Sequence, residues 1–239
     1  MTAIMELSWK AFDAKRQQTD LAIFPLGAVE VYGPHLPLGS DSIVAERVAR
    51  LVAERTGGIM MPLIPVGYSR SLADFPGTLN VSPAALRAYL ADLCDSVYGW
   101  GLRRFLFINT HLGNVSVVSE IAEGLRRDRG ARCAQIDWWR FIQPLSADVV
   151  ESGAAAHGHA SETGTSVLLY LAPQFVTPGA VNSPSKVSDP FPEIIQYRSY
   201  AEKTDTGTLG NAALGTKEKG EKLVRRAVDR IVEFVEKAL

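Results

Sequence analysis

Short apolar runs alternate with longer amphipathic stretches along this chain, which is the pattern of a parallel β-sheet covered by helices. Turn-forming or charged residues bound each apolar run. The runs are too short for membrane spans and are continuous enough to be buried on both faces of a sheet. The pattern therefore predicts an α/β protein whose core strands lie at residues 21–27, 58–65, 104–109 and 132–138.

The amphipathic stretches between and after these runs predict helices. Ser40 or Asp41 is placed to cap a helix that continues to residue 55. Ser82 followed by Pro83 is typical of an N-cap and first turn, here for a helix to residue 98. Further helices are expected over about 115–127 and 217–238, and another after the segment HGHASETGTS at 157–166.

One segment breaks this alternation. Residues 173–211 are rich in proline, glycine, serine and threonine, and a loop of this length in a compact domain is usually functional or mobile. Neither an internal repeat nor a shift in composition divides the chain. We therefore expect one domain over residues 1–239, which is long enough to bury a sizeable core.

Composition narrows the possible partners and compartment. The chain has 25 Lys and Arg against 26 Asp and Glu, a formal net charge of −1, so it offers no field that would gather nucleic acid or an anionic membrane. No apolar run reaches the length of a membrane span. Two cysteines are too few for a disulfide framework. These features predict a soluble cytoplasmic protein whose partner is a small molecule.

The side chains capable of chemistry gather in three polar segments. Two of these segments directly follow predicted strands, and in a parallel sheet ligands bind beyond the carboxyl ends of the strands. All four histidines of the chain fall within them. The residues concerned are Glu30, Tyr32, His35 and Asp41 after the first strand, Asn109, His111 and Asn114 after the third, and His157, His159 and Glu162 before a helix.

Carboxylates and imidazoles that meet at one edge suit a zinc- or manganese-class ion. Such an ion keeps a water in an open position, and that water could attack a carbonyl at neutral pH. Other interpretations exist for single residues. Asp41 could be only a helix cap, and His35, which lies between two prolines, could only fix its loop. His111 after a buried strand favours a ligand.

These residues resemble the creatininase, or creatinine amidohydrolase, family of metal-dependent amide hydrolases. That family shows Glu-x-His-Gly-Pro-His-Leu-Pro with an Asp eleven residues after the Glu. Here Glu30, the segment GPHLP at 33–37 and Asp41 match. The resemblance continues through FPGT at 75–78, NTHLGN at 109–114, the HA and TS pairs at 159–160 and 165–166, and EKG at 218–220, so it covers nearly the whole chain.

The resemblance implies a three-layer α/β/α fold with a mainly parallel sheet, usually assembled as a homohexamer. Family members commonly bind two metal ions with one bridging carboxylate. Glu30, Asp41 and His111 match the ligands of one ion, with Asp41 at the bridging position. His159 matches the histidine that transfers a proton.

Three positions depart from the family, and all belong to the second metal. The histidine of the first motif is Tyr32, a ligating glutamate two residues after His111 is Gly113, and the glutamate of a common ETS triplet is Gly164. We therefore expect one zinc or manganese ion per subunit. In an alternative register, His157 and Glu162 take the places of His159 and Gly164, and in either register Glu162 could reach the metal or act in catalysis.

The substrate-binding positions also depart. The family often has Glu-His where this chain has Ser71 and Leu72, so Asp74, with Tyr68 and Arg70 nearby, becomes a candidate contact. Trp138 and Trp139 follow the fourth strand, and one could form an aromatic wall beside the substrate. In the alternative interpretation, one tryptophan is core and the other only packs at the surface. With Tyr32, these are the candidate substrate-binding residues.

Together these features predict a metal-dependent hydrolase that opens a small cyclic substrate at an amide or related C–N bond. Water activated by the ion at Glu30, Asp41 and His111 would attack a ring carbonyl, and His159 or Glu162 would move the proton to the leaving group. Two alternatives remain. One is hydrolysis of a C–C bond in a cyclic polyol ketone of the dehydro-inosose type. The other is a non-catalytic ligand-binding scaffold with a degenerate metal site.

Overall fold

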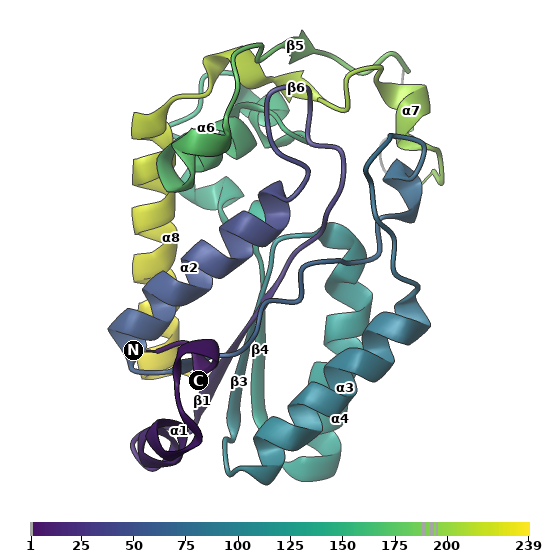
Figure 1. The fold of residues 1–239 in the computed structure, drawn as a ribbon. Helices are drawn as coiled ribbons and strands as arrows, with labels where there is room; N and C mark the ends of the chain where they lie inside the picture. Colours follow the sequence, from purple (N-terminus) through teal and green to yellow (C-terminus); the bar gives the residue numbers. More distant parts are fainter. Residues whose placement is uncertain (1, 188–189, 192–193, 195) are drawn as a thin grey trace.

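The central sheet of the protein has four parallel strands in the order β2-β1-β3-β4. We describe it from a computed structural model, for residues 2–187, 190–191, 194 and 196–239. The strands are β1 (Leu21–Leu26), β2 (Ile59–Met60), β3 (Arg104–Asn109) and β4 (Arg132–Asp137). Their carboxyl ends lie at the upper end of the sheet in Figure 1, so the segments that follow β1 and β3 begin side by side, as expected.

Helices cover both faces of this sheet. Side chains at alternate positions of β1 and β3 point to opposite faces, because successive side chains of a strand do so. Leu21, Ile23 and Leu106 pack with helices α2 (Ser40–Thr56), α6 (Glu162–Leu171) and α8 (Lys217–Lys237). Phe24 and Phe105 pack on the other face with α3 (Pro83–Gly99) and α4 (Val115–Arg129). Figure 1 shows α2 and α8 on one side of the strands and α3 and α4 on the other. The predicted three-layer α/β/α fold is confirmed.

The helix starts show which capping residues the chain uses. The Ser82 side chain accepts a hydrogen bond from the Ala85 backbone N–H, and Pro83 occupies the first turn of α3. Helix α2 differs, since its N-cap is Gly39 and no side chain caps it. Asp41 lies inside the first turn of α2, so its carboxylate is available for another role. The capping interpretation of Asp41 is wrong.

Two elements differ from the prediction. The run at 58–65 forms strand only at Ile59–Met60, with a further bridge at Ile64, because Pro62 and Pro65 have no N–H to give to a sheet. Helix α1 (Trp9–Arg16) was not predicted, and none of its residues is fully buried. Its N-cap is Ser8, which accepts from the Ala11 backbone N–H.

The proline-rich segment passes over the carboxyl ends of the strands (Figure 1). Its described part contains β5 (Asn182–Ser183), α7 (Tyr200–Lys203) and β6 (Gly210–Asn211), with β5 and β6 antiparallel. The short helix α5 (Trp138–Phe141) follows β4. Single 3₁₀ turns occur at Ile4–Glu6, Arg70–Leu72, Leu112–Asn114, Gln143–Leu145, Gly153–His157, Pro173–Phe175 and Ala212–Leu214. Among the described residues, no helix is both long and apolar enough to cross a bilayer.

Candidate active site

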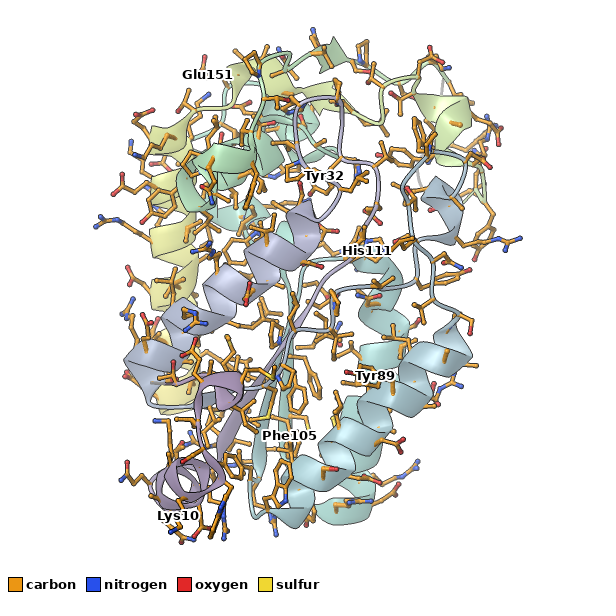
Figure 2. All side chains as sticks on the ribbon, viewed as in Figure 1. Lys10, Tyr32, Tyr89, Phe105, His111 and Glu151 are labelled. Carbon is orange, nitrogen blue, oxygen red and sulfur yellow. The ribbon has the colours of Figure 1, made fainter. Side chains whose placement is uncertain are left out.

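Three buried ligand-type side chains meet above the sheet. Glu30 follows β1, Asp41 lies in the first turn of α2, and His111 follows β3. One potential ligand atom from each lies within 4.8 Å of the other two, and all three side chains are buried. Figure 2 shows His111 and Tyr32 at the end of the sheet away from Lys10. The structure therefore brings together the three residues that the sequence proposes as ligands of one ion.

The hydrogen bonds of His111 fix the direction of its ring. Its Nε2 lies 2.9 Å from the carbonyl oxygen of Tyr68, which can only accept, so Nε2 carries a proton. The other ring nitrogen, Nδ1, lies 3.2 Å from Glu30 Oε2 and 3.4 Å from Asp41 Oδ2. Three electron-pair donors thus face one point, and only a cation or a second ring proton could lie between them.

Neighbouring groups hold both carboxylates in place. The Ser69 hydroxyl donates to Glu30 Oε2 at 2.6 Å, and the Trp139 indole N–H donates to Asp41 Oδ1 at 3.0 Å. The Asn109 side-chain amide donates to the carbonyl oxygen of His111 at 2.8 Å. Such supporting bonds orient metal ligands and strengthen their binding.

The electrostatics of the cluster are those of two buried acids and one base. Burial would lower the pKa of His111, but hydrogen bonds and negative charge from Asp41 and Glu30 outweigh it and raise that pKa well above its ordinary value. Burial would raise the pKa of Glu30, and the bond and charge of His111 hold it below the ordinary value. Burial and the charge of Glu30 raise the pKa of Asp41. The cluster thus attracts positive charge.

These features fit a divalent metal. Two carboxylate oxygens and one imidazole nitrogen are a ligand set that zinc and manganese accept. Within the described part of the chain, His111 is the only basic side chain in an ion pair with Glu30 or Asp41. A dication would balance both carboxylates, which a neutral imidazole cannot do.

The cluster forms the buried end of a cavity of about 730 Å³. Tyr32, Trp139 and His159 form its inner walls, and exposed residues border its outer part. These outer residues come from the segment before α3 and from the segment that contains α7, and they include Arg70, Ser71, Asp74, Tyr197 and Arg198.

His159 lines this cavity. Its Nε2 lies 2.7 Å from the carbonyl oxygen of Val31, which can only accept, so Nε2 donates this hydrogen bond. The ring packs between Tyr32 and Tyr200, with centroid distances of 4.5 and 5.0 Å. His157 also lines the cavity, but its Nε2 bonds with the Ser146 hydroxyl at 3.0 Å, and burial lowers its pKa.

Tyr32 and Gly164 pack against each other. Tyr32 is only 3% exposed, and a Cβ atom built on Gly164 would lie 3.3 Å from its ring. Burial, then the charges of Asp41 and Glu30 and a hydrogen bond to Asp41, raises the pKa of the phenol well above its ordinary value. Tyr32 therefore keeps its proton. This packing favours the register that aligns Gly164, rather than Glu162, with the glutamate of the family.

Gly113 has no room for a side chain. A Cβ atom there would lie 2.0 Å from the Tyr68 carbonyl oxygen and 2.6 Å from His111 Nε2. The close approach of these groups is the same contact that orients the His111 ring. In this chain a side chain at residue 113 would therefore force the Tyr68 carbonyl or the His111 ring to shift.

The structure does not bring Glu162 to the cavity. It begins α6, and its buried carboxylate accepts hydrogen bonds from the backbone N–H groups of Glu151 and Ser152, the Ser152 hydroxyl and the Lys219 ammonium. All of these partners lie away from the metal ligands, and Glu162 is not among the residues that line the cavity. The expected role of Glu162 at the metal or in proton transfer is therefore corrected to a structural one.

The two tryptophans have different surroundings, and only one of them reaches the cavity. Trp138 is fully buried in the hydrophobic core between the sheet and α8, so it cannot form a wall beside a substrate. Trp139 lines the cavity and holds Asp41. Asp74 lies at the exposed end of the cavity and accepts a hydrogen bond from the Ser199 hydroxyl. Of the substrate-contact candidates, Tyr32, Asp74 and Trp139 remain.

Sequence reasoning missed two supporting residues. Ser69, which holds Glu30, lies between Tyr68 and Arg70, which were considered only as possible substrate contacts. Tyr200, which packs on His159, comes from the segment interpreted as a loop. Neither residue belongs to a periodic pattern or follows a predicted strand. The only signals in the sequence are that Ser69 is close to the FPGT motif and that Tyr200 lies in a long loop.

The family assignment follows from the whole chain. The sequence profile of the family described as creatininase, creatinine amidohydrolase, matches residues 5–235. The chain belongs to the creatininase family. Family members are metal-dependent amidohydrolases, so this chain is an enzyme of that type with a candidate metal site at Glu30, Asp41 and His111.

Curated relatives carry several activities. A mycofactocin precursor peptide peptidase of Mycobacterium tuberculosis (strain CDC 1551 / Oshkosh) is 30% identical over 226 residues, covering 89% of this chain and 83% of its own length. A creatinine amidohydrolase of Pseudomonas putida is 28% identical over 252 residues, covering 96% and 94%. A 3-dehydro-scyllo-inosose hydrolase of Thermotoga maritima is 29% identical over 175 residues, covering 71% and 56%.

Solved structures agree with this assignment. A crystal structure of creatinine amidohydrolase superposes with a TM-score of 0.89 at 25% identity, covering 99% of this chain and 97% of that one. A structure titled "Creatininase Mn" gives 0.87 at 25% identity, covering 99% and 98%. A mutant creatininase of "Zn-Zn type" gives 0.84 at 26% identity, covering 99% and 97%. Structures of this fold therefore include manganese and zinc forms.

Proposed function

We propose that this protein hydrolyses an amide C–N bond in a small substrate, using one divalent ion held by Glu30, Asp41 and His111. The observation that carries this proposal is the convergence of Glu30 Oε2, Asp41 Oδ2 and His111 Nδ1 on one buried point at the end of a cavity. The hydrogen bond to the Tyr68 carbonyl already orients the His111 ring so that Nδ1 faces the two carboxylates. Pre-orientation of this kind is what a metal ligand needs.

The chemistry divides between the ion and the protein. When bound, a zinc- or manganese-class ion polarises a carbonyl and makes water nucleophilic at neutral pH. Ser69 and Trp139 hold the two carboxylates that would bind the ion. His159 accepts a proton at Nδ1 and returns it to the leaving nitrogen, while its Nε2–H stays on the Val31 carbonyl.

A cyclic amide is the leading substrate class. The creatinine amidohydrolase relative aligns over 96% of this chain, and its name describes cleavage of such a ring. The inner cavity is lined by the aromatic rings of Tyr32 and Trp139, 6.2 Å apart between centroids, which suit a flat ring. The outer residues Asp74 and Arg70 would distinguish substituents on that ring.

A peptide bond is the second candidate. The mycofactocin precursor peptide peptidase covers 89% of this chain at 30% identity. The cavity of about 730 Å³ is within the range that holds a drug-sized ligand. Its outer border carries Arg70 and Arg198, which could pair with a carboxylate of a short peptide.

The two earlier alternatives have less support. C–C hydrolysis of a cyclic polyol ketone relies on the inosose hydrolase relative, of which this chain covers 56%. A non-catalytic scaffold conflicts with the retention of all three ligand residues in one buried cluster and with family membership.

Metal identity, assembly and compartment complete the proposal. The manganese and "Zn-Zn type" forms of creatininase support either metal. Family resemblance supports a homohexamer, which the mass from light scattering would test. Near-neutral charge supports the expectation of no nucleic-acid partner. Two free cysteines fit a cytoplasmic enzyme, and fractionation of the cells that make it would test this.

The experiment is hydrolysis of three substrate panels by protein depleted of metal and then reloaded with zinc or manganese. The panels are cyclic amides, short peptides and a cyclic polyol ketone. We expect amide cleavage only by reloaded protein, with loss of at least about 100-fold in Asp41→Asn and His111→Ala. Asp229→Asn, an exposed aspartate on α8, is the matched control. Unchanged hydrolysis in the two ligand variants would show that the assignment is wrong.

A further inference from the structure

The two oxygens of the Asp41 carboxylate have different surroundings. Oδ2 faces His111 within the metal-ligand cluster. Oδ1 accepts the indole N–H of Trp139, a group that can only donate. A carboxylate that bridges two ions gives one oxygen to each. In this chain the indole N–H of Trp139 holds the second of these oxygens, and a second ion would have to displace it.

The phenol of Tyr32 packs beside Trp139, the residue that holds Asp41 Oδ1, with the two ring centroids 6.2 Å apart. Its ring also lies against His159, with a centroid distance of 4.5 Å. The ring fits because residue 164 is glycine. A Cβ atom at that position would lie 3.3 Å from ring carbon Cε1 and 3.7 Å from the hydroxyl oxygen. A longer side chain at 164 would have to displace the ring.

No alternative set of ligands surrounds this space. Among the described residues, the carboxylate and imidazole cluster able to hold an ion consists of Glu30, Asp41 and His111. Residue 113 is glycine and offers no ligand, and a Cβ atom there would lie 2.0 Å from the Tyr68 carbonyl oxygen. Yet the "Zn-Zn type" creatininase shows that this fold can hold two zinc ions.

We propose that Tyr32 limits this active site to one ion, because its aromatic side chain fills the space where a second ion would bind. Gly164 is the residue that makes room for the phenol. Asp41 is then a ligand of one ion rather than a bridge, and its far oxygen accepts the indole N–H of Trp139. This inference rests on the proposed metal site, and it identifies the residues that limit the number of bound ions.

The test is the metal content of purified protein after saturation with manganese and removal of free ion. Elemental analysis would count the ions, and electron paramagnetic resonance would distinguish isolated from coupled manganese. The key variant is Tyr32→His combined with Gly164→Glu, which removes the phenol and adds two ligands beside Asp41. We expect one ion in the wild type and two coupled ions in the double variant.

Two further variants serve as controls. Tyr32→Phe keeps the ring and should still hold one ion, because the space stays filled. Gly124→Glu, on the solvent side of α4 where a Cβ meets nothing within 4 Å, matches the added carboxylate and should also hold one ion. If the double variant does not fold, Tyr32→His alone is titrated with manganese, and a second, weaker binding event is expected.

The outcomes separate this inference from the proposed function. Two ions in the wild type, or a single ion in the folded double variant, would overturn the inference and leave the metal-dependent function standing. In the single-variant titration, absence of a second binding event would overturn it as well. A wild type that takes up no ion would overturn the proposed function itself.

Discussion

The Nε2–H of His111 donates to the Tyr68 carbonyl oxygen at 2.9 Å, and both atoms lie where a side chain of residue 113 would begin. This bond joins the segment after β3 to the segment before α3. It also decides which ring nitrogen faces Glu30 and Asp41. A backbone carbonyl therefore sets the chemistry of the site, and its position depends on the absence of a side chain at residue 113.

Gly113→Ala should weaken metal binding. The added methyl group would push the Tyr68 carbonyl away from His111 Nε2, and the ring would lose its direction. We expect a loss of about tenfold or more in metal affinity and about 1–3 kcal/mol in the free energy of unfolding. Calorimetric titration with zinc and urea unfolding would measure both. Gly124→Ala is the matched control, since its Cβ meets nothing, and equal effects of the two substitutions would contradict the role of Gly113.

His159→Gln should lower kcat without changing metal content. His159 lines the cavity and its Nε2 is held by the Val31 carbonyl, so Nδ1 is the ring nitrogen that we expect to move a proton. General acid or base catalysis contributes about 10²- to 10⁴-fold, and we expect a loss in that range. His157→Gln, two residues away, should cost much less because that ring is tied to Ser146. A larger loss in the His157 variant would restore the alternative register of this motif.

The strands show how far the sequence could predict the fold. The bounds of β3 were predicted correctly because its apolar run ends at a polar residue, Asn109. The strand predicted at residues 58–65 is too long. Its later apolar residues are buried without forming a β-ladder, and Pro62 interrupts the sheet. Helix α1 was missed because its residues are not fully buried, and burial is what produces a periodic pattern.

The candidate site also contains residues that the sequence could predict and residues that it could not. Glu30, Asp41 and His111 could be proposed because each lies close after a strand or within a specific motif, and the carboxyl ends of parallel strands meet. The structural role of Glu162 could not be predicted, because it depends on Lys219 from α8, far along the chain. Likewise, nothing local distinguishes Trp138 from Trp139. Their separation depends on which side of α5 faces the core.

Glu162→Gln should reduce stability rather than catalysis. Burial would raise the pKa of Glu162, but bonds from Lys219 and Ser152 outweigh it and lower the pKa. The carboxylate therefore contributes stability that is present above its unfolded pKa and is lost as pH falls through the folded pKa. We expect a loss of about 1.5–3 kcal/mol at neutral pH, and a smaller difference from wild type at about pH 3.

Urea unfolding at both pH values would measure this effect, with kcat measured where both proteins are folded. Glu236→Gln, near the end of α8, is the control for removal of a carboxylate. A large fall in kcat with unchanged stability would show that Glu162 acts in the reaction.

Metal binding should release protons at neutral pH. Asp41 and Glu30 raise the pKa of His111 well above its ordinary value, so the metal-free ring is largely protonated, and an ion must displace that proton from Nδ1. Apparent affinity should then fall about tenfold per pH unit as the pH drops below the metal-free pKa of His111. Zinc titrations by calorimetry in buffers of different ionisation enthalpy would count the protons released. His159→Gln should keep this release, because that ring is not a ligand. Zinc binding without proton release at neutral pH would mean that His111 is neutral before the ion arrives, and that the two carboxylates do not hold a ring proton in the absence of metal.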